Sequence, residues 1–174
     1  MRRTVLAIGS ILATTLLGAT PANATAHHSG PHDDLGWTPA PSAPWDVAAG
    51  LRCDFAIHGE PVVDEVVQRV LARYPDGSPK SVAYKGDLVV RVTNTDSDVF
   101  YDADASGSAI VEYHADGSQF WSVLGPVLVG VGEGNLDRGM YVVDGVYTLD
   151  ISASGHKTVT MAHGSTTDVC ERIA

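Results

Sequence analysis

The hexapeptide LVVRVT at residues 88–93 alternates in the manner of a β-strand and decides the expected fold class. Every second side chain, beginning with Leu88, faces one side of an extended chain, while Arg91 lies on the other side. β-Branched and aromatic runs of this kind favour strands over helices. Similar runs recur at 141–143, 146–151 and 159–161.

Turn dipeptides that contain glycine separate these runs, mostly at intervals of about 8–12 residues. This spacing is typical of antiparallel sandwiches and barrels. We therefore predict an all-β domain, an antiparallel barrel of about 8–9 strands, with a two-sheet β-sandwich as the alternative. The dipeptides are Asp76-Gly77, Gly86-Asp87, Ser106-Gly107, Asp116-Gly117, Asp144-Gly145, Ser154-Gly155 and His163-Gly164.

Residues 64–74 fit two kinds of secondary structure. Apolar side chains from Val63 to Tyr74 follow the three- and four-residue steps of a helix, and Asp64 could cap it. Most of them are valine, however, and this stiff β-branched residue favours strands. The segment also leads into a proline- and glycine-containing turn at 75–79. We predict one strand of a hairpin here, with one short helix at 64–74 as the alternative.

The first residues have the features of an export signal. Arg2 and Arg3 precede a mostly apolar run of about a dozen residues, too short to span a bilayer, and small residues follow it. We predict a signal peptide at 1–24, a leader rich in Pro and His at 25–48, and a barrel-like domain at 49–174. The mature protein is then secreted and has no membrane anchor. Within the leader, we expect Trp45 to pack on the domain, because an indole gains free energy by burial.

The chain is acidic, with 21 Asp and Glu against 11 Lys and Arg and a formal net charge of −10. Cleavage after residue 24 removes two arginines and no acid, which brings the charge to −12. Such a surface repels phosphate backbones, so we do not expect nucleic acid as a partner.

The two cysteines, Cys53 and Cys170, bracket almost all of the glycine-punctuated region. In an exported protein, two cysteines more often pair than remain free. We predict a disulfide between them, which requires the two ends of the domain to lie side by side. Closing so long a loop would stabilise the fold by roughly 4–5 kcal/mol in the chain-entropy model.

Four short stretches together form a recognisable pattern: AGLRCDF at 49–55, YPDGSPK at 74–80, VTN at 92–94 and TDVC at 167–170. In these stretches the chain resembles a group of secreted actinobacterial β-rich proteins of unknown function, over residues 49–172. The resemblance implies a compact β domain with a bridge that joins its ends. It favours the strand over the helix at 65–74, and it implies no activity.

An acidic cluster offers a candidate calcium site. Asp102, Asp104 and the following Ser106-Gly107 begin like an EF-hand loop, which places oxygen ligands at alternate positions and glycine at the sixth. Glu112 then falls one position before the place of the bidentate ligand. A solvated acidic turn is the competing interpretation.

His27 and His28 offer a candidate copper site. If the signal is cleaved after Ala26, His27 becomes the amino terminus, where its amine and imidazole could chelate Cu(II). Cleavage after Ala24 would instead place His27 third, where it could join the amine and two amides. A flexible polar leader is the competing interpretation.

No familiar hydrolase motif is present in the sequence. Tyr113, Phe120 and Trp121 could line the mouth of a ligand-binding barrel, although core packing also explains such aromatics. The leading hypothesis is a secreted non-catalytic β domain with a binding or structural role. The alternatives are a carrier of a small apolar ligand inside a barrel, and a copper-binding or copper-dependent protein.

Overall fold

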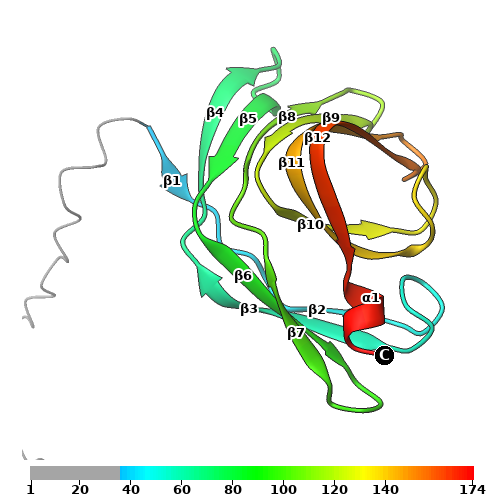
Figure 1. Cartoon of the computed structure of the whole chain (residues 1–174). Helices are drawn as coiled ribbons and strands as arrows, with labels where there is room; N and C mark the ends of the chain where they lie inside the picture. Colours follow the sequence, from blue (N-terminus) through cyan, green and yellow to red (C-terminus); the bar gives the residue numbers. More distant parts are fainter. Residues whose placement is uncertain (1–35) are drawn as a thin grey trace, which may run out of the picture. The chain divides into compact units, whose positions relative to one another are not determined.

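The computed structural model describes residues 36–174, which form twelve β-strands in two antiparallel sheets and one short helix (Figure 1). The smaller sheet contains β2 (Trp45–Val47), β3 (Ile57–Asp64), β6 (Leu88–Asn94) and β7 (Phe100–Asp104). The helix, α1, covers Val169–Arg172. The larger sheet contains β1 (Thr38–Pro39), β4 (Val67–Arg73), β5 (Pro79–Lys85), β8 (Ser108–Tyr113), β9 (Gln119–Leu124), β10 (Val127–Val131), β11 (Gly139–Ile151) and β12 (Lys157–Asp168).

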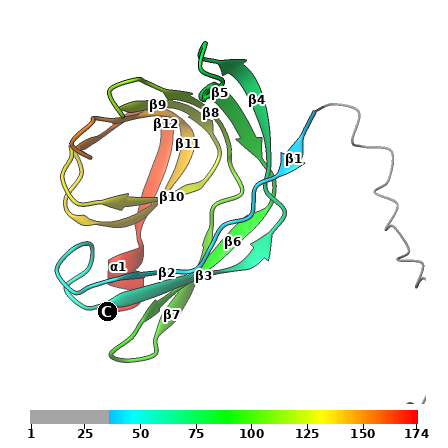
Figure 2. The same cartoon turned by 180° about the vertical axis from the view of Figure 1, so that it is seen from behind.

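The predicted closed barrel of 8–9 strands is wrong, and the two-sheet alternative fits the structure. The chain passes repeatedly between the sheets, from β3 to β4, from β5 to β6 and from β7 to β8 (Figure 2). Within the described residues, β1 pairs with β4 and β12 pairs with β11, so these strands do not meet to close a barrel. At one crossing, Gly86 has φ 135°, and a Cβ there would overlap the Glu65 carbonyl.

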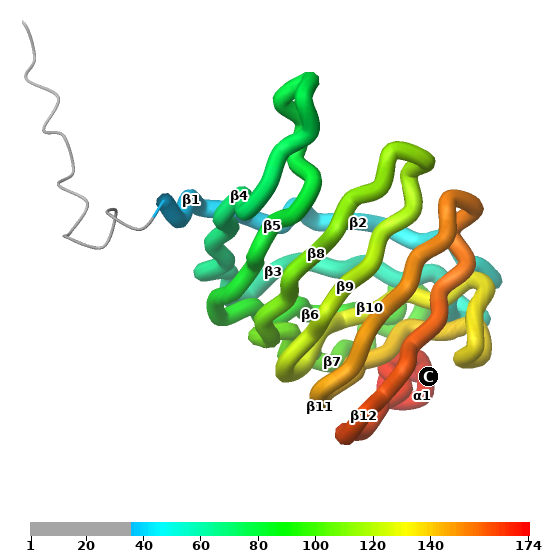
Figure 3. The backbone as a smooth tube through the Cα atoms, turned by 90° about the horizontal axis from the view of Figure 1, so that it is seen from above, coloured from blue at the N-terminus to red at the C-terminus, as the bar shows by residue number. Residues whose placement is uncertain are grey.

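Three hairpins of the larger sheet have the same turn. In the turns at 74–78, 114–118 and 152–156, the first residue's N–H donates to the fifth residue's carbonyl, and the fourth residue, a glycine, donates back to the first. These glycines have φ of 88°, 87° and 89°, a conformation that L-residues with a side chain rarely adopt. Figure 3 shows the hairpins β4–β5, β8–β9 and β11–β12 lying in a row.

The strand prediction for 65–74 is confirmed, because β4 pairs with β5 along its length. The residues with helical spacing belong to different elements, because Val63 lies in β3 and Val70 in β4, and the register of β4 shifts on both sides of Ala72. The alternation at 88–93 is also confirmed: Val90 and Val92 are buried in β6, while Arg91 is partly exposed.

Aliphatic side chains fill the interior in two clusters. The first lies under β8, β9, β10 and β11 and includes Val111, Val143 and Leu149. The second lies between β3, β6, β7 and the start of β11, and includes Ile57 and Val92. These side chains are nearly inaccessible to solvent, so the two clusters form the core of the fold.

The predicted bridge is confirmed: Cys53 and Cys170 are joined, with their Cα atoms 5.4 Å apart. Cys170 lies in α1, directly after β12, and Cys53 precedes β3. Arg138 supports the same corner, since it donates to the Asp54 carboxylate at 2.6 Å and to the Cys53 carbonyl at 3.2 Å.

Two short strands belong to the segment expected to be a leader. β1 pairs with β4, and β2 pairs with β3. Trp45 in β2 packs against the second core cluster, as expected, and a Cβ at Gly59 would overlap its indole. Within residues 36–174, no helix is long and apolar enough to span a membrane.

Candidate groove on the outer face of the larger sheet

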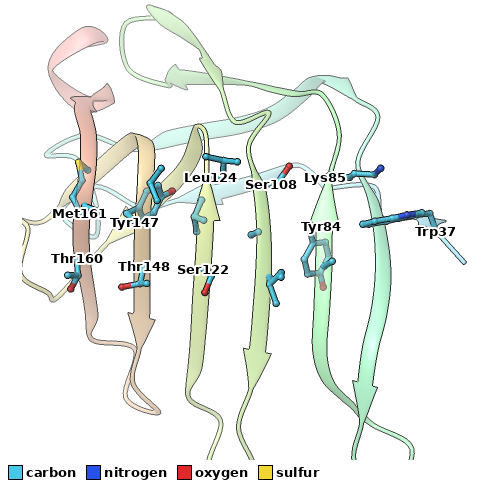
Figure 4. A pocket seen from close by; sticks show the side chains of 16 residues that line it. Trp37, Tyr84, Lys85, Ser108, Ser122, Leu124, Tyr147, Thr148, Thr160 and Met161 are labelled. Atoms are coloured by element: carbon cyan, nitrogen blue, oxygen red, sulfur yellow. The ribbon is translucent and has the colours of Figure 1, made fainter. Parts of the chain in front are cut away.

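An apolar groove crosses β5, β8, β9, β11 and β12 on their outer face (Figure 4). Its volume is about 620 Å³. Trp37 and Lys85 lie at one end, and Thr160 and Met161 lie at the other. This volume falls within the range of about 300–1,000 Å³ that is usual for ligand pockets.

Strand register explains which side chains reach the groove. Ile110 pairs with Ser122, which pairs with Thr148, which in turn pairs with Thr160, so these four form one row across the sheet. Their neighbours along each strand, such as Val111, are buried in the core. Because successive side chains of a strand alternate between faces, the row must point away from the core.

A second row makes the groove apolar. Leu124 pairs with Val146, and both are large aliphatic side chains on the solvent side of the sheet. Leu124 is 64 % exposed, Val146 48 % and Ile110 45 %. Solvent-facing positions of a half-buried sheet are usually polar. Here these three aliphatic side chains instead form an exposed apolar surface that no other part of the described residues covers.

Charges are distributed unevenly around the groove. At the β5 end, the Lys85 ammonium lies 4.5 Å from the centroid of the Trp37 ring. Arg69 of β4 pairs directly with Ala83, a residue of the groove. Neither Lys85 nor Arg69 takes part in the four ion pairs found within residues 36–174.

Acids flank the middle of the groove, on β8 and β11. Asp144 and Asp150 are exposed on β11. Asp144 lies two residues before Val146, and Asp150 lies two residues after Thr148. Glu112, also exposed, lies two residues beyond Ile110 on β8. Strand alternation places all three carboxylates on the face that carries the groove. The groove is therefore polarised, with cations at the β4–β5 end and acids along β8 and β11.

Tyr147 lies under the groove and is 3 % exposed. Its hydroxyl is buried and has no hydrogen-bond partner among the described residues. Burial, and then the charge of Asp144, raise the pKa of this phenol above its ordinary value. The Tyr147 side chain packs within the first core cluster and forms part of the floor of the groove.

The structure does not bring the calcium candidates together. Asp102 and Asp104 lie on β7 in the smaller sheet, whereas Glu112 lies on β8 in the larger one. Arg91 binds both oxygens of Asp102 at 2.8 Å, and this hydrogen bonding lowers the pKa of that carboxyl. Within residues 36–174, no group of three or more His, Cys, Asp and Glu side chains is arranged to hold a metal ion.

The aromatic candidates are also separated. Tyr113 and Trp121 pack against the first core cluster, and the Tyr113 hydroxyl lies 2.9 Å from that of Tyr84. Burial, followed by the contact with Tyr84, raises the pKa of Tyr113. Phe120 pairs with Glu112 and so faces the opposite side of the sheet from Trp121. Tyr113 does line a smaller hollow of about 430 Å³, together with Val82 and Tyr84.

The copper candidates, His27 and His28, lie outside the described residues.

The residues that matter most for the groove were not singled out from the sequence. Ile110, Leu124 and Val146 are ordinary strand formers, and they become conspicuous only when the register shows that they face solvent together. A usable sequence signal was the charge of residues 67–86, where Arg69, Arg73, Lys80 and Lys85 stand against a single acid, Asp76.

The fold and the groove define a disulfide-closed, two-sheet antiparallel β protein with an open apolar surface on its larger sheet. Comparison with known proteins gave no matching family model, no similar curated protein and no similar solved structure. The groove's own chemistry is therefore the basis for the function proposed below.

Proposed function

We propose that this chain is a non-catalytic binding domain that works outside the cell and holds an apolar ligand in the groove of its larger sheet. The observation that carries the proposal is the exposure of Ile110, Leu124 and Val146 side by side in a groove of about 620 Å³. Contiguous exposed apolar surface on a folded domain usually marks a binding site, because leaving it in water costs free energy. The export signal predicted from the sequence and the disulfide between Cys53 and Cys170 support work in an oxidising compartment.

This proposal changes the place of the ligand that the sequence led us to expect. A carrier with its ligand inside a barrel needs a closed barrel, whereas the two sheets here do not form one, and Val143 and Leu149 pack in the core beneath the larger sheet. The groove lies on the other face of the same strands. An apolar ligand would therefore lie against the outside of the sheet, between the side chains of neighbouring strands.

A neutral apolar dye tests the proposal. Phenylnaphthylamine should bind the purified protein with an increase in fluorescence, and Leu124→Glu with Val146→Glu should weaken that binding at least tenfold. Both residues are exposed, so neither change has to bury a charge. Val62→Glu is the matched control, because Val62 is 43 % exposed but lies on β3 in the smaller sheet. The proposal fails if the dye does not bind, or if the groove variant and the control bind it equally.

A further inference from the structure

We infer that the groove takes an amphipathic anion, a long-chain fatty acid, with its carboxylate at Lys85 and Arg69 and its acyl chain across β8, β9 and β11 toward β12. This inference rests on the proposed function, since it names the ligand class of the same groove.

The charge distribution fixes which end would hold the carboxylate. The β4–β5 hairpin is the basic part of an otherwise acidic domain, with four cations and one acid between residues 67 and 86. Lys85 and Arg69 are the two of these cations that border the groove. Farther along the groove, on β11, Asp144 and Asp150 would repel an anion. Lys85 is the one charged side chain among the residues that line the groove, so an anionic head is attracted to its end.

Trp37 gives the cationic end its geometry. Its indole lies 4.5 Å from the Lys85 ammonium and holds that group beside the groove. The ring also removes water from one side of the ammonium, and a charge pair in a less polar environment is stronger than the same pair in water. Trp37 and Lys85 both line the groove, so a carboxylate at this end can pair with the ammonium while its first methylenes meet Ala83 and Ile110.

The length and the lining of the groove suit an alkyl chain. From β5 to β12 the groove crosses four strand intervals of about 4.8 Å, or about 19 Å in total. No carboxylate, amide or guanidinium lies among its lining residues, although the chain as a whole is rich in acids. The polar atoms along the path are the hydroxyls of Ser108, Ser122, Thr148 and Thr160.

The backbone hydrogen bonding of the strands beneath the groove argues against an extended peptide as the occupant. A peptide that binds a sheet usually pairs with an edge strand, whose backbone groups are free. Four of the five strands that the groove crosses, β5, β8, β9 and β11, are paired on both sides, and only β12, at its end, has a free edge among the described residues. A peptide lying there would leave its own N–H and C=O groups without partners over an apolar floor. An alkyl chain has no such groups.

The test compares laurate with dodecanol, which share a chain but differ in charge, by displacement of the neutral dye. Laurate should displace the dye at a concentration at least fivefold lower than dodecanol does. Shortening the acid to decanoate and octanoate should weaken displacement by up to about fourfold per methylene group. Lys85→Gln should raise the concentration of laurate needed to displace the dye at least fivefold, and it should leave the concentration of dodecanol unchanged.

Lys80→Gln is the matched control for this variant. Lys80 lies on the same hairpin and also contacts an aromatic ring, that of Tyr74, at 5.8 Å, but it does not line the groove. Equal effects of the two substitutions on laurate would show long-range attraction alone and would overturn the inference. Equal displacement by laurate and dodecanol would also overturn the inference of a fatty acid. The proposed function would still stand in that case, as long as the dye binds the groove.

Two further occupants are distinguished in the same samples. Light scattering with and without laurate would detect a second copy of the chain in the groove. Such a copy would form a dimer, and this dimer would either dissociate when laurate is added or prevent laurate from binding. Sedimentation with phosphatidylglycerol vesicles would detect a lipid surface. Dimerisation that blocks laurate, or vesicle binding without laurate binding, would overturn the assignment of a free fatty acid.

Discussion

The side-chain amide of Asn94 donates a hydrogen bond of 3.0 Å to the carbonyl oxygen of Ile173, so the end of β6 is tied to the end of the chain. Asn94 is 4 % exposed, and its side-chain oxygen also accepts from the Asp96 N–H at 3.0 Å. This single side chain thus satisfies a polar group of its own turn and one of Ile173, which lies 79 residues farther along the chain. The contact holds α1 against the second core cluster, where Ile173 is fully buried.

Asn94→Ala should lower the free energy of unfolding by about 1–3 kcal/mol, because it leaves the buried Ile173 carbonyl without its donor. Urea unfolding followed by circular dichroism measures the change. Thr95→Ala is the control, since its hydroxyl donates to the Ala56 carbonyl at an exposed position and should cost less. Equal losses for the two variants would contradict a special role of the Asn94 contact.

Replacing both cysteines by alanine should lower the free energy of unfolding by about 2–5 kcal/mol, because the bridge closes a loop of 117 residues. The measurement is thermal unfolding of the double variant beside the oxidised parent. A thiol titration of the denatured, unreduced parent should find no free thiol. Two free thiols in that titration would refute the bridge.

Tyr147→Phe should leave the free energy of unfolding unchanged or raise it by about 1 kcal/mol, because the buried hydroxyl has no partner among the described residues. Tyr84→Phe gives the opposite expectation, a loss of about 1 kcal/mol, since the Tyr84 hydroxyl is 2.9 Å from that of Tyr113. Denaturant titrations of the two variants would decide the point, and a marked loss in Tyr147→Phe would show that its hydroxyl is bonded.

The hairpin turns should respond to acid. Hydrogen bonds from the Ser78 hydroxyl and N–H lower the pKa of Asp76, and Ser118 does the same for Asp116. A depressed carboxyl pKa stabilises the fold above the unfolded-state pKa, and this contribution is lost as the pH falls through the folded-state pKa. In an NMR titration, Ser78→Ala should move the pKa of Asp76 upward and leave that of Asp116 in place. A shift of both, or of neither, would contradict the local cause.

Local features of this fold were well predicted from sequence. Alternation at 88–93, glycine turns and the bridge depend on near neighbours or on one covalent bond, and all three were confirmed. The closed barrel was wrong because closure depends on which distant strands pair. The bends between β5 and β6 and between β7 and β8 redirect the strands into a second sheet, and turn residues look alike in both arrangements.

The candidate site shows the same limit more strongly. Phe120 and Trp121 were grouped as one aromatic site, although adjacent residues of a strand face opposite sides, and the structure separates them. Leu124 and Val146 form the groove only because register places them side by side, across 22 positions of sequence. Register between distant strands comes from the packing of both sheets, so it could not be predicted from either segment alone.

The bridge between Cys53 and Cys170 also determines how the domain would respond to mechanical tension. A force that pulls on the two ends of the chain first reaches β1 and β2, which pair with β4 and β3, and then passes from Cys53 to Cys170 through the covalent bond. The strands between the two cysteines lie outside that path and cannot be extended while the bond is intact. A domain tethered at its ends would therefore keep the strands beneath the groove folded even if β1 and Trp37 were pulled away, and reduction of one bond would expose those strands to the pull.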